Sequence, residues 1–309
     1  MKRIGIVLSA LLAAALLVWM LGDGRLTDAL VRLFSIPPAI AAAIIASQAF
    51  SYYCRARRIS DEFSRTVAIP FRQYLRISLL HNFSVNVVPF RGGELMLPYL
   101  LRRAGIPGMR AVATLIWLRM QDAIVLASLA VLLWPDLPLW LRALAGAGMV
   151  LGVTVFRITS AHLRAPRRWP KLQHAFDALT EALDAPVSSW LWSITNWITK
   201  LFGLSLLLHA LIDAPLVTTS LGALGGELSA MLPVQGMGGF GTYEAGVAFG
   251  LLHGVGDWTT MLVPAFAVHS FTLLFAAFSG VFAWFALPDI SPATAPADLP
   301  ADSDSEKNS

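Results

Sequence analysis

The stretch Pro89-Phe90-Arg91-Gly92-Gly93-Glu94 places a cation and an anion three residues apart in sequence that otherwise indicates burial in a membrane. An unpaired arginine at the centre of a membrane-inserted helix costs about 2.5–3.5 kcal/mol on insertion scales. The proline and the two glycines interrupt a regular helix. The stretch therefore predicts a break in a buried helical segment, and its charges require a partner or a wet cavity.

The composition is that of an integral membrane protein. Of the 309 residues, 56% are hydrophobic and 14% are charged, whereas soluble domains carry about 25% charged residues. The net charge of +4 arises from arginines in predicted loops, without the basic and aromatic patch that would indicate a nucleic-acid partner. The single cysteine, Cys54, excludes an internal disulfide and a cysteine-based metal site. The six histidines are scattered, so the sequence predicts no metal site and no cofactor.

Six apolar runs approach or exceed the length of about 20 residues that a bilayer span needs. They are residues 4–22, 37–54, 111–134, 139–156, 188–211 and 258–286. Lysines and arginines concentrate at residues 2–3, 55–65, 102–110 and 157–171, and basic loops of this kind stay in the cytoplasm. The sequence therefore predicts an all-α, polytopic protein of the cell (inner) membrane with both termini inside.

Two further segments are apolar but interrupted. Residues 66–101 lie between two basic loops, are too short for two full spans and a turn, and contain the break at Pro89–Glu94. Residues 214–256 lie between connections without Lys or Arg and are broken by Pro233 and the glycines up to Gly241. Non-helical backbone at membrane depth is tolerated inside protein or beside a wet cavity. We predict two re-entrant helical hairpins, with two short spans as the alternative for 214–256.

The order span, span, hairpin, span occurs twice and predicts two membrane repeats, residues 1–136 and 137–287. Because each repeat has three full spans, the second repeat is inverted relative to the first. Inverted repeats with paired broken segments are typical of transporters, whose substrate site lies between the repeats. Residues 157–186 predict an amphipathic segment on the cytoplasmic surface, and residues 288–309 predict a disordered acidic tail.

Charged and glycine-rich positions in these segments are the candidate translocation residues. Arg91 and Glu94 form either a self-neutralising pair or a site where Arg91 receives an anionic headgroup. Arg119 and Asp122 form either a structural salt bridge or part of the pathway. The glycines of the second hairpin suit either an anion seat or close helix packing. The full set is Asn86, Arg91, Glu94, Arg119, Asp122, Lys200, Gly236, Gly239, Glu244 and His269.

The acidic residues of the second half have few cations to pair with. No Lys or Arg follows Lys200 until the C-terminal tail. Glu227 and Glu244 are left with Lys200 and, across the repeats, with Arg91 and Arg119. We predict that the two repeats meet electrostatically in this way, or else that these glutamates are protonated.

Two motifs resemble signatures of a known membrane family. Asn86-Val87-Val88-Pro89-Phe90-Arg91-Gly92-Gly93-Glu94, followed by Arg119-x-x-Asp122, is similar to the first signature of the lysylphosphatidylglycerol-synthase transmembrane-domain family. The stretch Leu232-Pro233-x-x-Gly236-x-x-Gly239-x-x-x-x-Glu244 is similar to the second. The similarity covers residues 4–286. The chain departs from the family at Leu118, where an acidic residue is frequent, and at His269, where arginine is frequent.

The resemblance implies a flippase-like domain that moves an anionic, aminoacylated or polyprenyl-linked lipid between leaflets. It implies roles for Asn86, Pro89, Arg91, Gly93, Glu94, Arg119, Asp122, Gly236, Gly239 and Glu244. Lysyl transfer itself is not expected, because nothing after residue 287 resembles the aminoacyl-transferase domain of the synthases.

Three functions are compatible with the sequence. The first is a lipid flippase or transporter, not an enzyme, in which the two hairpin ends meet around a headgroup site. The second is a membrane-embedded lipid-modifying enzyme with Glu94, Asp122 or His269 as acid or base. The third is a scaffold for an enzyme of a lipid, glycolipid or hopanoid pathway. We favour the first, with a membrane lipid as partner, because the sequence has no nucleophile elbow, metal motif or cofactor loop.

Overall fold

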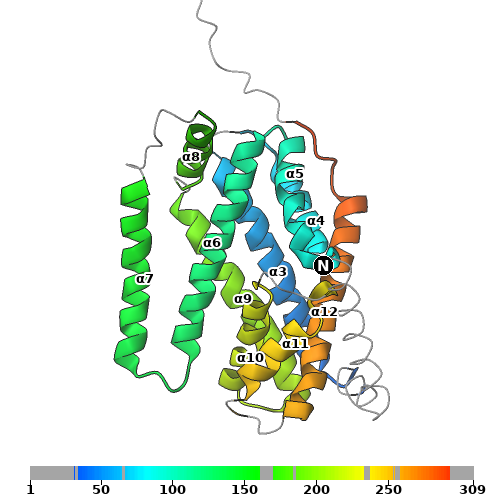
Figure 1. The fold of residues 1–309 in the computed structure, drawn as a ribbon. Helices are drawn as coiled ribbons and strands as arrows, with labels where there is room; N and C mark the ends of the chain where they lie inside the picture. Colours follow the sequence, from blue (N-terminus) through cyan, green and yellow to red (C-terminus); the bar gives the residue numbers. More distant parts are fainter. Residues whose placement is uncertain are drawn as a thin grey trace, which may run out of the picture.

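The computed structural model describes residues 31, 34–64, 67–160, 170–183, 186–232, 237–252, 254 and 258–292, and these residues form an all-helical bundle (Figure 1). The elements are α3 (Pro38–Phe63), α4 (Phe71–Val87), η1 (Pro89–Leu95), α5 (Met96–Arg103), α6 (Gly108–Leu133), α7 (Leu139–Ser160), α8 (Pro170–Leu183), α9 (Val187–Ile212), α10 (Leu216–Ser229), η2 (Met237–Gly239), α11 (Thr242–Leu251) and α12 (Trp258–Ala286). The η elements are short 3₁₀ helices.

Prolines set many of the helix starts. Proline fixes its own φ and has no N–H, so it suits a helix start, where the N–H has no helical partner. Five helices begin directly after a proline with extended backbone, namely α3 after Pro37, α4 after Pro70, α6 after Pro107, α9 after Pro186 and α10 after Pro215. The boundaries of these helices are therefore encoded locally.

Three described helices are long and apolar enough to cross a membrane. They are Gly108–Leu133, Val187–Ile212 and Thr260–Ala286, and they confirm the positions predicted at 111–134, 188–211 and 258–286. Helix α7 covers the run predicted at 139–156. The chain is thus a multi-pass membrane protein. The predicted span 4–22 lies outside the described residues.

Helix α3 differs from the predicted span 37–54, because it continues to Phe63. Arg55, Arg57 and Arg58 therefore lie within a helix and not in a loop, and the cytoplasmic side predicted for them stays a prediction. No proline or glycine interrupts residues 39–63, so nothing local ends the helix. A polar stripe at spacings of three and four residues lies buried or half-buried along it: Gln48, Ser51, Arg55, Arg58 and Glu62.

The break at Pro89–Glu94 joins two helices, as predicted. Helices α4 and α5 are connected by η1, and α4 packs against both. A Cβ atom on Gly93 would overlap the backbone carbonyl of Ser84. Glycine at this position therefore lets η1 lie directly on α4.

The second interrupted segment also forms two helices, α10 and α11, which pack against each other with η2 between them in the chain. A Cβ on Gly225 of α10 would overlap the carbonyl of Gly246 on α11, and the reverse also holds. Small residues of this kind let helix backbones approach closely. The two breaks meet, because η1 and η2 contact each other. Figure 1 shows the α4–α5 and α10–α11 pairs toward opposite ends of the bundle; their re-entrant orientation and the inverted repeat stay predictions.

The main core lies where α3, α6, α9, α10, α11 and α12 meet. Helices α3 and α9 pack closely within it, since a Cβ on Gly203 would lie 2.9 Å from the Ser47 Cβ, and Ser51 Oγ donates to Asn196 Oδ1 at 2.8 Å. On the outer surface, large apolar side chains such as Phe285, which is 81% exposed, form a surface suited to lipid.

Two peripheral predictions are corrected in part. Within the segment predicted as amphipathic, 157–186, residues 157–160 complete α7, and residues 161–169 lie outside the described residues. Helix α8 follows and packs against α6, where Arg110 Nε lies 3.6 Å from Glu181 Oε1.

The tail predicted as disordered from residue 288 begins with ordered chain. Ile290 is buried, and Asp289 Oδ1 lies 2.8 Å from Arg76 Nη1 on α4. Residues 288–292 are therefore fixed against α4 by an apolar and an ionic contact. Residues 293–309 lie outside the described residues.

Candidate functional site

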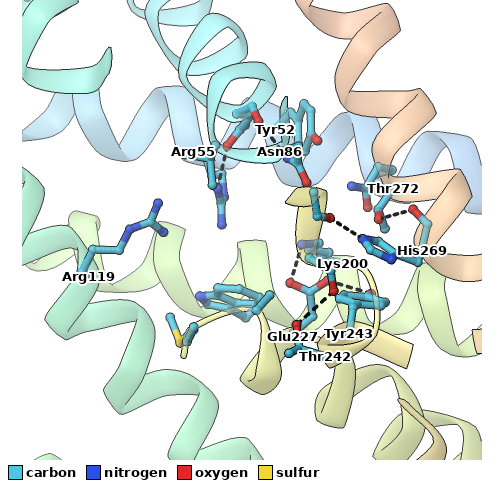
Figure 2. Close-up of a pocket in the computed structure, with 18 residues that line it drawn as sticks. Tyr52, Arg55, Asn86, Arg119, Lys200, Glu227, Thr242, Tyr243, His269 and Thr272 are labelled. Carbon is cyan, nitrogen blue, oxygen red and sulfur yellow. Dashed lines mark hydrogen bonds and ion pairs between the residues drawn. The ribbon is translucent and has the colours of Figure 1, made fainter. Parts of the chain in front are cut away.

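A polar cavity of about 100 Å³ lies at the centre of the bundle, lined by residues of α3, α4, α6, α9, α10, η2, α11 and α12. Figure 2 shows Arg55 and Asn86 on one side of it and Lys200, Glu227 and Tyr243 on the opposite side. A space of this size holds several waters. The cavity provides the wet environment that charged residues inside a membrane protein require.

Arg119 on α6 binds the end of the first hairpin. Its Nη2 and Nε donate to Glu94 Oε2 at 2.6 and 2.9 Å, and its Nη1 donates to Asp122 Oδ2 at 3.3 Å. The predicted pairing of Arg119 with Asp122 is thus confirmed. Glu94 is bonded to Arg119, a partner that the sequence did not suggest. The side chain of Arg91 lies outside the described part of the chain, so its pairing with Glu94 stays a prediction.

Asp122 is a buried junction of three helices. It is 1% exposed, and its Oδ1 accepts from Arg58 Nη1 of α3 at 2.6 Å and from Trp197 Nε1 of α9 at 2.9 Å. Arg58 Nη1 also donates to Ser193 Oγ at 2.7 Å. These additional hydrogen bonds offset part of the cost of burying the ion pair, although Arg58 Nε has no partner within the described structure. Asp122 therefore fixes α3, α6 and α9 relative to one another beside the cavity.

Lys200 and Glu227 form an ion pair on the opposite wall. Lys200 Nζ donates to Glu227 Oε2 at 2.5 Å, and Tyr243 Oη donates to Glu227 Oε1 at 3.2 Å. The Lys200 ammonium also lies 5.4 Å from the ring centre of Trp197, within cation–π range. Lys200, one of the partners predicted for Glu227, is therefore the residue that pairs with it.

Glu244 and His269 form a second buried pair. Glu244 Oε2 accepts from the backbone N–H of Gly241 at 2.7 Å, which caps α11, and its Oε1 lies 2.6 Å from His269 Nδ1. His269 Nε2 lies 2.9 Å from the Gly238 carbonyl. His269 therefore joins Glu244 of α11 to the backbone of η2.

The prediction that Glu244 pairs with Lys200 or Arg119 is therefore wrong, because these cations bond Glu227, Glu94 and Asp122. The partner of Glu244 is His269, a residue of its own half. The left-handed backbone of Gly238 and Gly239, with φ of 60° and 82°, brings η2 onto the imidazole. This contact depends on the turn, which residue spacing does not reveal.

Arg55 is the cavity cation without a carboxylate. Its Nη1 donates to Asn82 Oδ1 at 2.6 Å, and its guanidinium lies 5.6 Å from the ring centre of Trp197. Within the described residues, no carboxylate lies within ion-pair distance of Arg55. The charge of Asp122 acts on Arg55 from a longer distance, and the Asp122 carboxylate is bonded to Arg58.

Several N–H donors at the cavity lack an acceptor. Arg55 Nε and Asn82 Nδ2 make no hydrogen bond within the described structure, and Asn82 is only 3% exposed. Gln48 Nε2 lies near the Tyr52 hydroxyl but does not reach hydrogen-bonding geometry with it. All of these residues line the cavity. The N–H groups themselves are covered by neighbouring atoms, whereas the Arg55 side chain lines the cavity without a carboxylate partner among the described residues, which suits an acceptor that carries negative charge.

The predicted site residues largely come together. The cavity is lined by five of them: Asn86, Arg119, Lys200, Gly239 and His269. Three more each bond directly to one of these, namely Glu94, Asp122 and Glu244. Gly236 lies outside the described residues, as does the side chain of Arg91.

Other cavity residues were missed, chiefly Gln48, Tyr52 and Arg55 on α3. Positions 48, 52 and 55 are spaced by four and three residues and so share one helix face. Extending the helical pattern past residue 54 would have identified this face. Trp197 and Tyr243 sit in apolar helices and carry no comparable signal.

In the part of the chain that the structure describes, no three His, Cys, Asp or Glu side chains form a group that could hold a metal ion. A family model described as "Lysylphosphatidylglycerol synthase TM region" matches residues 6–283. No match was found among curated proteins or among solved structures.

Proposed function

The chain belongs to the lysylphosphatidylglycerol synthase transmembrane-region family, and from this premise we propose that it moves a phosphate-bearing lipid between the leaflets of the cell membrane. Family membership supports a function involving membrane lipid. In the proposal, the headgroup passes through the central cavity while the hydrocarbon chains stay in the apolar part of the bilayer. The N-in/C-in inverted repeat predicted from the loop charges is part of the same proposal, because it provides two opposed ways into one site.

The wall formed by Arg55 and Asn82 is the observation that carries the proposal. Arg55 lines the cavity with no carboxylate of the described residues at ion-pair distance, and a phosphate would supply its counter-charge. Charge-assisted hydrogen bonds to phosphate are about twice as strong as neutral ones. The outer surface of the surrounding helices is apolar and suited to lipid chains, whereas this interior wall is polar and suited to a headgroup.

The proposal is tested with purified protein in vesicles that contain fluorescent phosphatidylglycerol, whose outer-leaflet fraction is measured by quenching. Wild type should redistribute the lipid, and Arg55→Gln should slow redistribution at least about tenfold. That factor corresponds to the loss of one charge-assisted hydrogen bond of about 1.5–3 kcal/mol, at 1.4 kcal/mol per factor of ten. The matched control is Arg72→Gln, which removes an exposed arginine from α4.

Two results would contradict the proposal. One is a wild-type protein that does not redistribute the lipid, and the other is an Arg55→Gln protein as active as wild type. Mass spectrometry of the same vesicles distinguishes the enzyme alternative, since a lipid-modifying enzyme would generate a new lipid species and a transporter would not.

A further inference from the structure

A second, apolar space lies on the flank of the bundle. This lateral groove has a volume of about 370 Å³ and is lined by Ala49, Tyr52 and Tyr53 of α3, Leu75 and Leu79 of α4, and Phe275, Phe278, Ser279 and Phe282 of α12. Helix α4 packs against both α3 and α12 and forms its floor. Phe278 and Phe282 are 73% and 53% exposed, so the groove opens onto the outer surface of the bundle, which faces lipid.

Tyr52 connects this groove to the polar cavity, because it lines both. Its ring packs edge-on against Phe275 of α12, with centroids 5.3 Å apart, and it is 6% exposed. Its hydroxyl lies beside Gln48 and in the field of Arg55. Tyrosine has an apolar body and a polar end, and Tyr52 is shared by the linings of the apolar groove and of the polar cavity.

We propose that the lateral groove holds a hydrocarbon chain of the same lipid whose phosphate binds at Arg55 and Asn82, so that the lipid lies across Tyr52. The inference rests on the proposed function and adds to it a binding site for the chain and a sideways route between α3 and α12. The headgroup reaches the cavity from the flank of the bundle, and the chain does not leave the apolar environment.

The position of the groove favours a lipid chain over a helix of a partner protein, because Tyr52 lines both the groove and the polar cavity. A lipid has a thin apolar chain joined to a charged headgroup, which matches the two connected spaces.

The first test uses the wild-type protein and a phosphatidylglycerol that carries a photoreactive diazirine in the middle of one acyl chain. After illumination, digestion and mass spectrometry, adducts should map to the groove lining, namely residues 49–53, 75–79 and 275–282. Undecaprenyl phosphate with a photoreactive chain forms a second arm, and the stronger adduct identifies the chain class. Adducts confined to other helices in both arms would overturn the inference.

The second test blocks the groove. Ser279→Trp adds a large side chain to the groove wall, whereas Val281→Trp is the matched control, since position 281 lies about 200° further around α12 and is outside the groove lining. Phosphatidylglycerol retained per protein after purification should fall at least about tenfold in Ser279→Trp and stay at the wild-type level in Val281→Trp. Ala49→Trp repeats the block from α3. Retention at the wild-type level in both blocking variants would refute the groove site.

A soluble headgroup separates failure of this inference from failure of the proposed function. Binding of glycerol phosphate, measured as a thermal shift, should persist in Ser279→Trp and be lost in Arg55→Gln. If the protein gives the expected adducts but does not redistribute lipid, the groove site is supported and the transport function is contradicted. If it redistributes lipid without adducts in the groove, transport is supported and the groove site is contradicted.

Discussion

Replacing Lys200 by methionine tests how much the Lys200–Glu227 pair stabilises the bundle. The two side chains are 13% and 5% exposed and their charged atoms are 2.5 Å apart. Without the ammonium group, Glu227 keeps the Tyr243 hydroxyl at 3.2 Å but loses its counter-charge. Removal of one partner from a buried pair costs about 3–5 kcal/mol. We therefore expect Lys200→Met to unfold at a clearly lower temperature than wild type, measured by size-exclusion of the detergent-purified protein after heating.

The double variant Lys200→Met/Glu227→Gln supplies the comparison. Removal of both charges from a buried pair is often neutral or stabilising, so its unfolding temperature should return close to that of wild type. Arg72→Met, an exposed substitution on α4, controls for loss of a surface charge. A Lys200→Met protein as stable as wild type would refute the reasoning. If the stable double variant no longer redistributes lipid, Lys200 has a role in transport apart from its role in stability.

Gly93→Ala should displace η1 from α4 and reduce lipid redistribution, because the added methyl would overlap a backbone carbonyl. Gly92→Ala should be tolerated, because its methyl would meet only a side-chain atom at 3.0 Å; equal activity of the two variants would contradict the role of this contact. Asp122→Asn should lower the free energy of unfolding by about 3–5 kcal/mol, because it leaves the buried Arg58 without its carboxylate. An unchanged unfolding temperature of Asp122→Asn would show that the Arg58–Asp122 pair contributes no net stability.

The sequence was sufficient for features that depend on local chemistry. Apolar runs of the right length located α6, α9 and α12. The Pro89–Glu94 stretch located a break between two helices, because proline and glycine interrupt a helix whatever surrounds it. The pair Arg119–Asp122 was predictable because a spacing of three residues places both side chains on one helix face.

Partners that are distant in the chain were not predictable. Glu94 and Arg119 are 25 residues apart in the chain, as are Glu244 and His269. The turns between the members of each pair bring them together, and residue spacing alone does not predict the geometry of such turns. Arg55 was misplaced for a related reason. The rule that basic residues mark cytoplasmic loops assumes that they are exposed, whereas the surroundings of Arg55 are built by α4, α6 and α9.

The polar stripe of α3 has a consequence for biosynthesis. Arg58 is made well before the groups of α6 and α9 that bond it. Asp122 follows Arg58 by 64 residues and Ser193 follows it by 135. At about 5–20 residues per second, the ribosome needs roughly 3–13 s to reach Asp122. During that time Arg58 lacks its carboxylate partner, and an unpaired arginine at the centre of a membrane-inserted helix would cost about 2.5–3.5 kcal/mol. We therefore expect α3 to stay at the insertion machinery until α6 has been synthesised and to enter the lipid together with it. Helix α3 would then be inserted later than its place in the order of synthesis implies.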